Sequence, residues 1–190
     1  AFLPITLFFD NDQPDPRTRA TTTQQSYDQT VNRYLTRREA FIQTYSANLQ
    51  GAEKERAAEQ LGKFFDEEIL AGFVKLEVFA GNLELFLNGG ARIEIMVKAF
   101  ASPLATSEYN LALTQRRISS VRNYFRKFQN GIFEGYIRNG QLKVSTLPLG
   151  ESAASPGVSD DARDKRRSVF SLDASRERRA EILEVRLFKN

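Results

Sequence analysis

Residues 92–117 read RIEIMVKAFASPLATSEYNLALTQRR, and the change of pattern within them indicates the fold class. Ile93, Ile95 and Val97 alternate with other residue types, as they do in a strand with one buried face. From residue 109 to 128, apolar residues instead return every three or four positions, which is the spacing of one helix face. The stretch therefore predicts a strand, a short connection and a helix.

The same two patterns extend outward from this unit. Alternation predicts three further strands, near residues 5–9, 142–146 and 182–187. Three-four spacing predicts helices over 26–50, with Ser26 as the N-cap and Gly51 as the stop, and over 52–88. The order β-α-β-α-β-β favours an α/β (α+β) fold, a two-layer sandwich with a helical insertion after the first strand.

The core of such a sandwich is expected where the helix stripes meet the sheet. On the last strand, Leu183, Val185 and Leu187 are predicted to share the inner face. The predicted core residues are Phe73, Leu76, Leu83, Ile93, Ile95, Val121, Phe125, Val185 and Leu187.

The composition excludes several classes of function. The 190 residues contain no Cys and no His, which removes thiol nucleophiles, His-dependent triads and the usual zinc ligands. Lys and Arg exceed Asp and Glu by only 27 to 24, so nucleic-acid binding is not indicated. There is no apolar run of membrane-spanning length. We expect a protein that is not an enzyme and that uses no cofactor or metal.

Four blocks of sequence carry a resemblance to a known family. They are Phe9-Asp10, the stretch from Lys98 to Pro103 (KAFASP), the stretch from Tyr109 to Arg117 (YNLALTQRR), and Arg178-Arg179-Ala180-Glu181-Ile182. In this order they resemble the OmpA-like peptidoglycan-binding family. In that family a strand ends in Gly-His-Thr-Asp and precedes Tyr-Asn-x-x-Leu-Ser-x-x-Arg, and a later block reads Asn-Arg-Arg-Val-Glu-Ile.

The resemblance implies a single OmpA-like domain over residues 1–190, forming the C-terminal part of a larger envelope protein. Residues 17–63 are then a helical insertion and residues 148–175 a loop insertion. Such a domain lies in the periplasm, attached to the outer membrane through an upstream part of the protein. Added segments of this kind build a partner surface, cover a groove, or are tolerated at a loop.

One helix face carries the chemistry that the residues themselves suggest. Asn110, Leu113 and Arg117 are three, four and seven positions apart, so they lie on one side of the predicted helix. A guanidinium on that face could hold a carboxylate in fork geometry. The alternative is that Arg117 pairs with an acidic residue of its own chain, such as Asp10 or Asp12.

The resemblance assigns a ligand to this face. In the family, the matching Arg holds the carboxylate of a stem-peptide diaminopimelate, and the Asp of Gly-His-Thr-Asp holds its ammonium. Here these positions are Arg117 and Ser102. A hydroxyl cannot neutralise an ammonium, so a charge-assisted hydrogen bond of ~1.5–3 kcal/mol becomes an ordinary one. The peptidoglycan-binding residues are then expected to be Arg117, Asn110, Ser102, Leu113, Asp10 and Asn11.

Two functions remain open at this point. The first is non-catalytic binding of peptidoglycan that tethers an outer-membrane protein or complex to the cell wall. The second is an OmpA-like envelope scaffold that has lost wall binding and binds other envelope proteins through its insertions. A nucleophilic role for Ser102 is disfavoured, because the chain has no His and only Lys98 lies near it in sequence.

Overall fold

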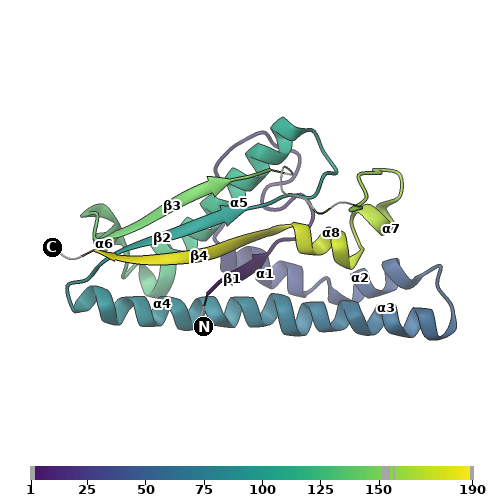
Figure 1. Cartoon of the computed structure of the whole chain (residues 1–190), viewed down its shortest axis with the longest axis horizontal. Coiled ribbons are helices and arrows are strands. Elements are labelled where there is room, and N and C mark those ends of the chain that lie inside the picture. Colours follow the sequence, from purple (N-terminus) through teal and green to yellow (C-terminus); the bar gives the residue numbers. More distant parts are fainter. Residues whose placement is uncertain (1–2, 151–154, 156, 189–190) are drawn as a thin grey trace.

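A computed structural model describes residues 3–150, 155 and 157–188, and it shows one mixed four-stranded sheet with helices packed against it (Figure 1). The strands are β1 (Ile5–Phe8), β2 (Arg92–Ala99), β3 (Leu142–Pro148) and β4 (Arg179–Phe188), in the spatial order β1-β4-β2-β3. β4 is antiparallel to both β1 and β2, and β2 is parallel to β3. The predicted α/β class and the order of its strands and main helices are confirmed.

Two helices place the apolar stripes on the sheet. Helix α5 (Ser107–Lys127) packs against β2, β3 and β4, and helix α4 (Leu70–Asn88) packs against β1. Helix α1 (Tyr27–Leu35) contacts both of them. Two short helical segments between α5 and β3, η2 (Phe128–Asn130) and α6 (Glu134–Arg138), were not predicted.

Helix α4 is the end of a long helical rod that runs along the molecule (Figure 1). Helix α3 (Gly51–Lys63) continues through the π-helical turn η1 (Phe64–Ile69) into α4 without a break. This helical rod packs closely against β1 at Gly72. A Cβ at that position would lie 2.3 Å from the carbonyl oxygen of Thr6. No helix in the described part of the chain is long and apolar enough to cross a membrane.

The predicted helix over residues 26–50 is wrong in one respect. It is split into α1 and α2 (Arg38–Ser46), while Ser26 is the N-cap as expected. At the break, the Thr36 hydroxyl donates to the carbonyl of Arg33 at 2.7 Å, a local bond that competes with the regular helix. Gly51 begins α3 rather than ending the earlier helix, so the 17–63 insertion holds three helices instead of a pair.

The predicted inner face of the last strand also needs correction. Consecutive residues of β2 lie opposite Glu184 and Ile182, so Leu183 is an extra residue, a β-bulge. The bulge shifts the alternation by one position, and Ile182 is buried in place of Leu183. Val185 is partly buried against the core, whereas Leu187, near the end of the strand, is 62% exposed.

The rest of the predicted core is confirmed. Phe73 is partly buried against the core. The fully buried members of the predicted set are Leu76, Leu83, Ile93, Ile95, Val121 and Phe125.

The two insertions pack on each other. The 148–175 segment contains helix α7 (Lys165–Ser168) and most of α8 (Leu172–Glu177), and its residues 151–154 and 156 lie outside the described residues. Helix α7 contacts α2, and the ring of Phe170 lies 4.9 Å from that of Phe41. Because α8 leads directly into β4, this packing fixes the residues at the start of that strand.

We predict that Phe125→Ala lowers the free energy of unfolding by about 3–5 kcal/mol, because it leaves a cavity in a packed core. Phe125 is fully buried, and three other rings lie with centroids 5.8–6.4 Å away. Urea unfolding monitored by circular dichroism measures the change. Leu85→Ala is the control, since Leu85 is 70% exposed and should change stability by less than about 0.5 kcal/mol. A loss below about 1 kcal/mol for Phe125→Ala would contradict this packing.

Candidate functional site

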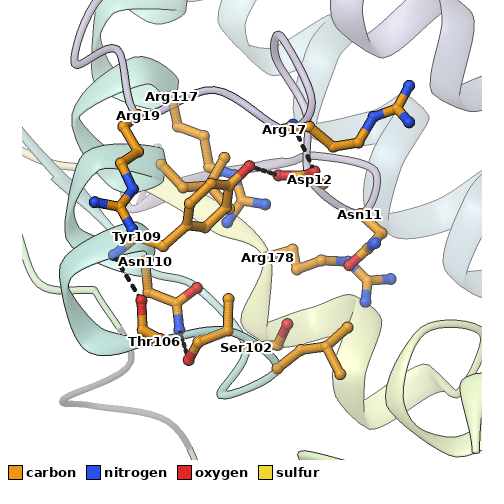
Figure 2. A pocket seen from close by; sticks show the side chains of 13 residues that line it. Asn11, Asp12, Arg17, Arg19, Ser102, Thr106, Tyr109, Asn110, Arg117 and Arg178 are labelled. Atoms are coloured by element: carbon orange, nitrogen blue, oxygen red, sulfur yellow. Dashed lines mark hydrogen bonds between the residues drawn. The ribbon is translucent and has the colours of Figure 1, made fainter. Parts of the chain in front are cut away.

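A pocket of about 500 Å³ lies at one end of the sheet (Figure 2). We name it the strand-end pocket. Because β1 and β2 are both antiparallel to β4, they run in the same direction, and their carboxyl ends meet beside the first residues of β4. Helix α5 starts at this end as well, so two loops, a helix and the start of a strand converge there.

Five of the six predicted site residues line the strand-end pocket. They are Arg117, Asn110, Ser102, Leu113 and Asn11. Asp10 does not line it, because its carboxylate accepts from the Arg37 guanidinium and from the backbone N–H of Asn11. The grouping expected from the sequence is therefore present in space, with Asp10 displaced to a neighbouring ion pair.

Arg117 is completely buried and is held by backbone carbonyls. Its Nε donates to the carbonyl oxygen of Gln13 at 3.2 Å, and its Nη1 donates to that of Phe100 at 2.6 Å. The guanidinium lies over the ring of Phe9 at 5.4 Å. Its Nη2 is buried and has no hydrogen-bond partner. The guanidinium therefore has an unsatisfied N–H group, and its side chain is part of the pocket lining.

Arg117 does not form an ion pair with any acidic residue in the part of the chain that the structure describes. Asp10 is paired with Arg37. The carboxylate of Asp12 accepts from the Tyr109 hydroxyl at 2.5 Å and lies 3.9 Å from Arg116. The internal ion pair that the sequence left open is therefore not formed with either residue.

The charge of Arg117 is incompletely balanced by the protein. Burial, followed by the positive charges of Arg178 and Arg116, lowers the pKa of the Arg117 guanidinium to about 9. Asp12 acts in the opposite direction and is the smaller influence. The group is still a cation at neutral pH, and a carboxylate placed at Nη2 would raise its pKa again.

Arg178 is a second buried arginine in the strand-end pocket, and it was not among the predicted site residues. It is 1% exposed and stands between α8 and β4. Its Nη2 donates to the carbonyl of Val169 and to the Ser175 hydroxyl, each at 2.8 Å. Its Nε and Nη1 are buried and make no hydrogen bond of regular geometry, and the Tyr34 hydroxyl lies beside the guanidinium. Its position at the start of the last strand, beside the predicted carboxyl ends of β1 and β2, was the signal that could have revealed it.

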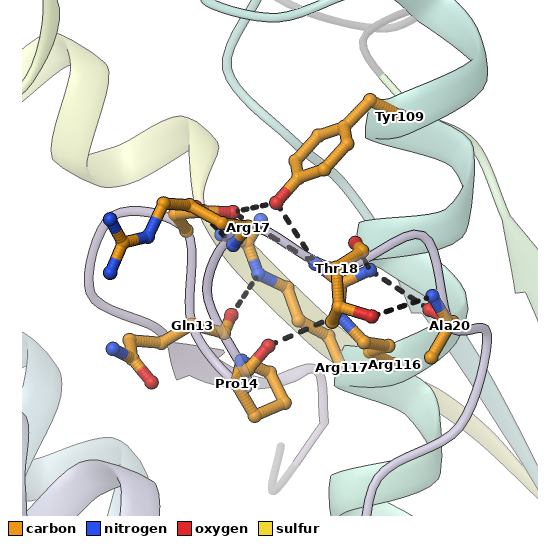
Figure 3. A network of polar contacts seen from close by, with 9 residues as sticks. Gln13, Pro14, Arg17, Thr18, Ala20, Tyr109, Arg116 and Arg117 are labelled. Atoms are coloured by element: carbon orange, nitrogen blue, oxygen red, sulfur yellow. Dashed lines mark hydrogen bonds and ion pairs between the residues drawn. The ribbon is translucent and has the colours of Figure 1, made fainter.

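Arg116 fastens the loop that forms one wall of the strand-end pocket (Figure 3). It is fully buried, its Nε donates to the carbonyl of Pro14 at 3.1 Å, and its Nη1 donates to the carbonyls of Thr18 and Ala20 at 2.7 and 2.9 Å. This loop also contains non-glycine residues with positive φ, which need such support. They are Asp12, Asp15 and Arg17.

The loop after β2 is held by the first turn of α5. The Thr106 side chain caps the helix by accepting from the N–H of Tyr109 at 3.4 Å. Asn110 donates its side-chain amide to the carbonyl of Ala105 at 3.0 Å and is buried. Asn110 thus braces the loop that presents Ser102, in addition to lining the pocket.

Arginine dominates the charged lining of the strand-end pocket. Among the described lining residues Asp12 is the one acid, and its other oxygen accepts from the backbone N–H of Arg17 at 2.9 Å. The lining arginines are Arg17, Arg19, Arg117 and Arg178. A cavity with this balance attracts anions.

The pocket offers anion binding rather than the activation of a nucleophile. Within the described chain no Lys lines the pocket, and the sequence has no His, so neither of these two activating bases stands beside the Ser102 hydroxyl. No group of three or more His, Cys, Asp or Glu side chains among the described residues is placed to hold a metal ion.

Comparison with known proteins identified no relative of this chain. No protein-family model matches the chain, and searches of curated proteins and of solved structures found no match. The resemblance to the OmpA-like family therefore depends on the four sequence blocks alone.

We predict that Arg116→Gln loosens the loop over residues 13–20 without unfolding the protein, because it removes charge-assisted bonds to three carbonyls. Trypsin cleavage after Arg17 and Arg19 should then accelerate about tenfold or more, since cleavage follows local opening. Mass spectrometry of the fragments measures the rate. Arg126→Gln is the matched control, because Arg126 is exposed on the same helix. Equal cleavage of the two variants would show that Arg116 does not hold the loop.

Proposed function

We propose that the strand-end pocket binds a peptidoglycan stem peptide without catalysis and so tethers an outer-membrane protein or complex to the cell wall. One observation carries this proposal: Arg117, a lining residue of a pocket of about 500 Å³, is buried and its Nη2 has no hydrogen-bond partner. Because Nε and Nη1 already donate to carbonyls, the unsatisfied Nη2 is the group that would donate a charge-assisted hydrogen bond to a carboxylate. The volume lies within the range of pockets that bind small molecules.

The other lining residues fit a peptide end. Leu113 supplies an apolar wall for the methylene chain of a diaminopimelate-type residue, and Asn11 faces the pocket with an amide that can meet peptide groups (Figure 2). Ser102 occupies the position where the OmpA-like resemblance places the ammonium of that residue. The resemblance and the pocket thus point to the same partner.

The cellular setting follows from the same proposal. A wall-binding domain of this kind works in the periplasm, as the C-terminal part of a larger envelope protein whose upstream part is attached to the outer membrane. The domain is then attached to the cell wall through the carboxylate end of the stem peptide, and the upstream part of the protein connects it to the outer membrane.

A second candidate function is an envelope scaffold that binds another protein. The observation that favours it is an exposed apolar stripe on α4, at positions four, four and seven residues apart: Leu70, Val74, Val78 and Leu85. In the described chain, none of the exposed large hydrophobic side chains falls in residues 17–63 or 148–175. A protein partner is therefore expected on α4 rather than on the insertions.

We predict that Arg117→Gln weakens binding to purified sacculi by about ten- to hundredfold, because it removes a charge-assisted hydrogen bond of ~1.5–3 kcal/mol. Co-sedimentation at increasing protein concentration measures the apparent affinity. Arg126→Gln, an exposed change on the same helix, should bind like the unchanged protein.

A variant outside the buried network separates a binding defect from a folding defect. Ala105 is exposed and lines the strand-end pocket, so Ala105→Trp should block the pocket and reduce binding while the melting temperature stays within a few degrees. If the folded, unchanged protein does not sediment with sacculi, the wall-binding proposal fails and the scaffold function replaces it.

A further inference from the structure

The strand-end pocket contains two unsatisfied guanidinium groups rather than one. Arg117 enters it from α5 and Arg178 enters it from the start of β4 (Figure 2). Both are at least 99% buried. Nη2 of Arg117 makes no hydrogen bond, and neither do Nε and Nη1 of Arg178, although the Tyr34 hydroxyl lies beside the Arg178 guanidinium. Buried donors without partners are rare in proteins and indicate a missing acceptor.

The missing acceptors are not carboxylates of this chain. In the described residues, no carboxylate lies within ion-pair distance of Arg117 or Arg178, because the acids of this region have other partners. Asp10 is paired with Arg37, Asp12 lies 3.9 Å from Arg116, and Glu177 lies 3.2 Å from Arg179. An unpaired buried cation is strongly unfavourable. A ligand that brings negative charge would therefore gain binding free energy at both guanidinium groups.

Among the described lining residues, no free carboxylate is present to neutralise an ammonium. The position where the OmpA-like family has an acid is Ser102, and the one lining acid, Asp12, is already bonded to Tyr109 and to the N–H of Arg17. Four arginines line the cavity, so a positively charged ligand group would be repelled there. The charge pattern thus selects against the ammonium that a free diaminopimelate side chain carries.

We propose that Arg117 and Arg178 together hold two carboxylates of one ligand, so that the stem-peptide end bound here is a dicarboxylate without a free ammonium. This inference rests on the proposed peptidoglycan function and specifies its ligand. Diaminopimelate has this form when its side-chain amine is acylated, as in a peptide cross-link. Acylation turns the ammonium into a neutral amide and leaves the carboxylates ionised, and the Ser102 hydroxyl can share a hydrogen bond with that amide.

Two synthetic tripeptides test this directly. Both are Ala-Glu-diaminopimelate in the stem-peptide linkage, and they differ only in that the side-chain amine of diaminopimelate is free in one and acetylated in the other. Isothermal titration calorimetry with the full chain should show tighter binding of the acetylated peptide. Ser102→Asp should reverse this order, because it supplies a charge for the ammonium and competes for the guanidinium groups. If the free-amine peptide binds the unchanged protein as tightly or more tightly, the inference is overturned.

A third peptide tests the role of Arg178. It is the acetylated tripeptide with its C-terminal carboxylate converted to the amide, and it should bind the unchanged protein about tenfold or more weakly. In Arg178→Gln, which should itself lose about tenfold for the acid peptide, amidation should make little further difference. A purely structural Arg178 would not produce this coupling. Additive losses from amidation and from Arg178→Gln would overturn its assignment as the second carboxylate anchor.

Failure of this inference is distinguishable from failure of the wall-binding proposal. If a tripeptide binds in an Arg117-dependent way but with a preference for the free amine, wall binding stands and the dicarboxylate ligand is rejected. If none of the three peptides binds the folded protein, both are rejected.

Discussion

Two arginines that are buried without a carboxylate partner give the strand-end pocket its excess of positive charge. A guanidinium in the interior needs acceptors for all its N–H groups. Among the described residues, Arg117 and Arg178 donate to backbone carbonyls and to the Ser175 hydroxyl, and the Tyr34 hydroxyl lies beside Arg178. The nitrogens without a hydrogen bond belong to two side chains that line the strand-end pocket. The pocket is thus prepared for anions by an unbalanced charge in the fold rather than by exposed surface lysines.

The fold provides the means of keeping these cations in place. Parallel β1 and β2 bring two loops to one edge of the sheet, and Arg116 ties the first loop to α5. The 148–175 insertion has a definite structural role, because Val169 and Ser175 accept from Arg178. Since that insertion also packs on α2 of the other insertion, both added segments contribute to the geometry of the site.

Much of this could be predicted from the sequence, because alternation and three-four spacing report directly on which face is buried. The strands and helix α5 follow from such patterns, whereas the grouping of Ser102 with Arg117 came from the resemblance to the OmpA-like family. The β-bulge at Leu183 could not be predicted, since an extra residue changes the pairing without changing the composition. Arg178 was missed for a related reason: its role depends on which carbonyls surround it and which donors they leave unsatisfied.

The way the loop after β1 is attached has a consequence for its freedom to change. Arg116 and Arg117 bind the main-chain carbonyls of Gln13, Pro14, Thr18 and Ala20, and not their side chains. Every residue type offers the same carbonyl, so the loop sequence can drift while its anchorage persists. Residues of this loop at the edge of the pocket can therefore be substituted one at a time with little effect on the fold, as long as the two arginines on α5 are retained.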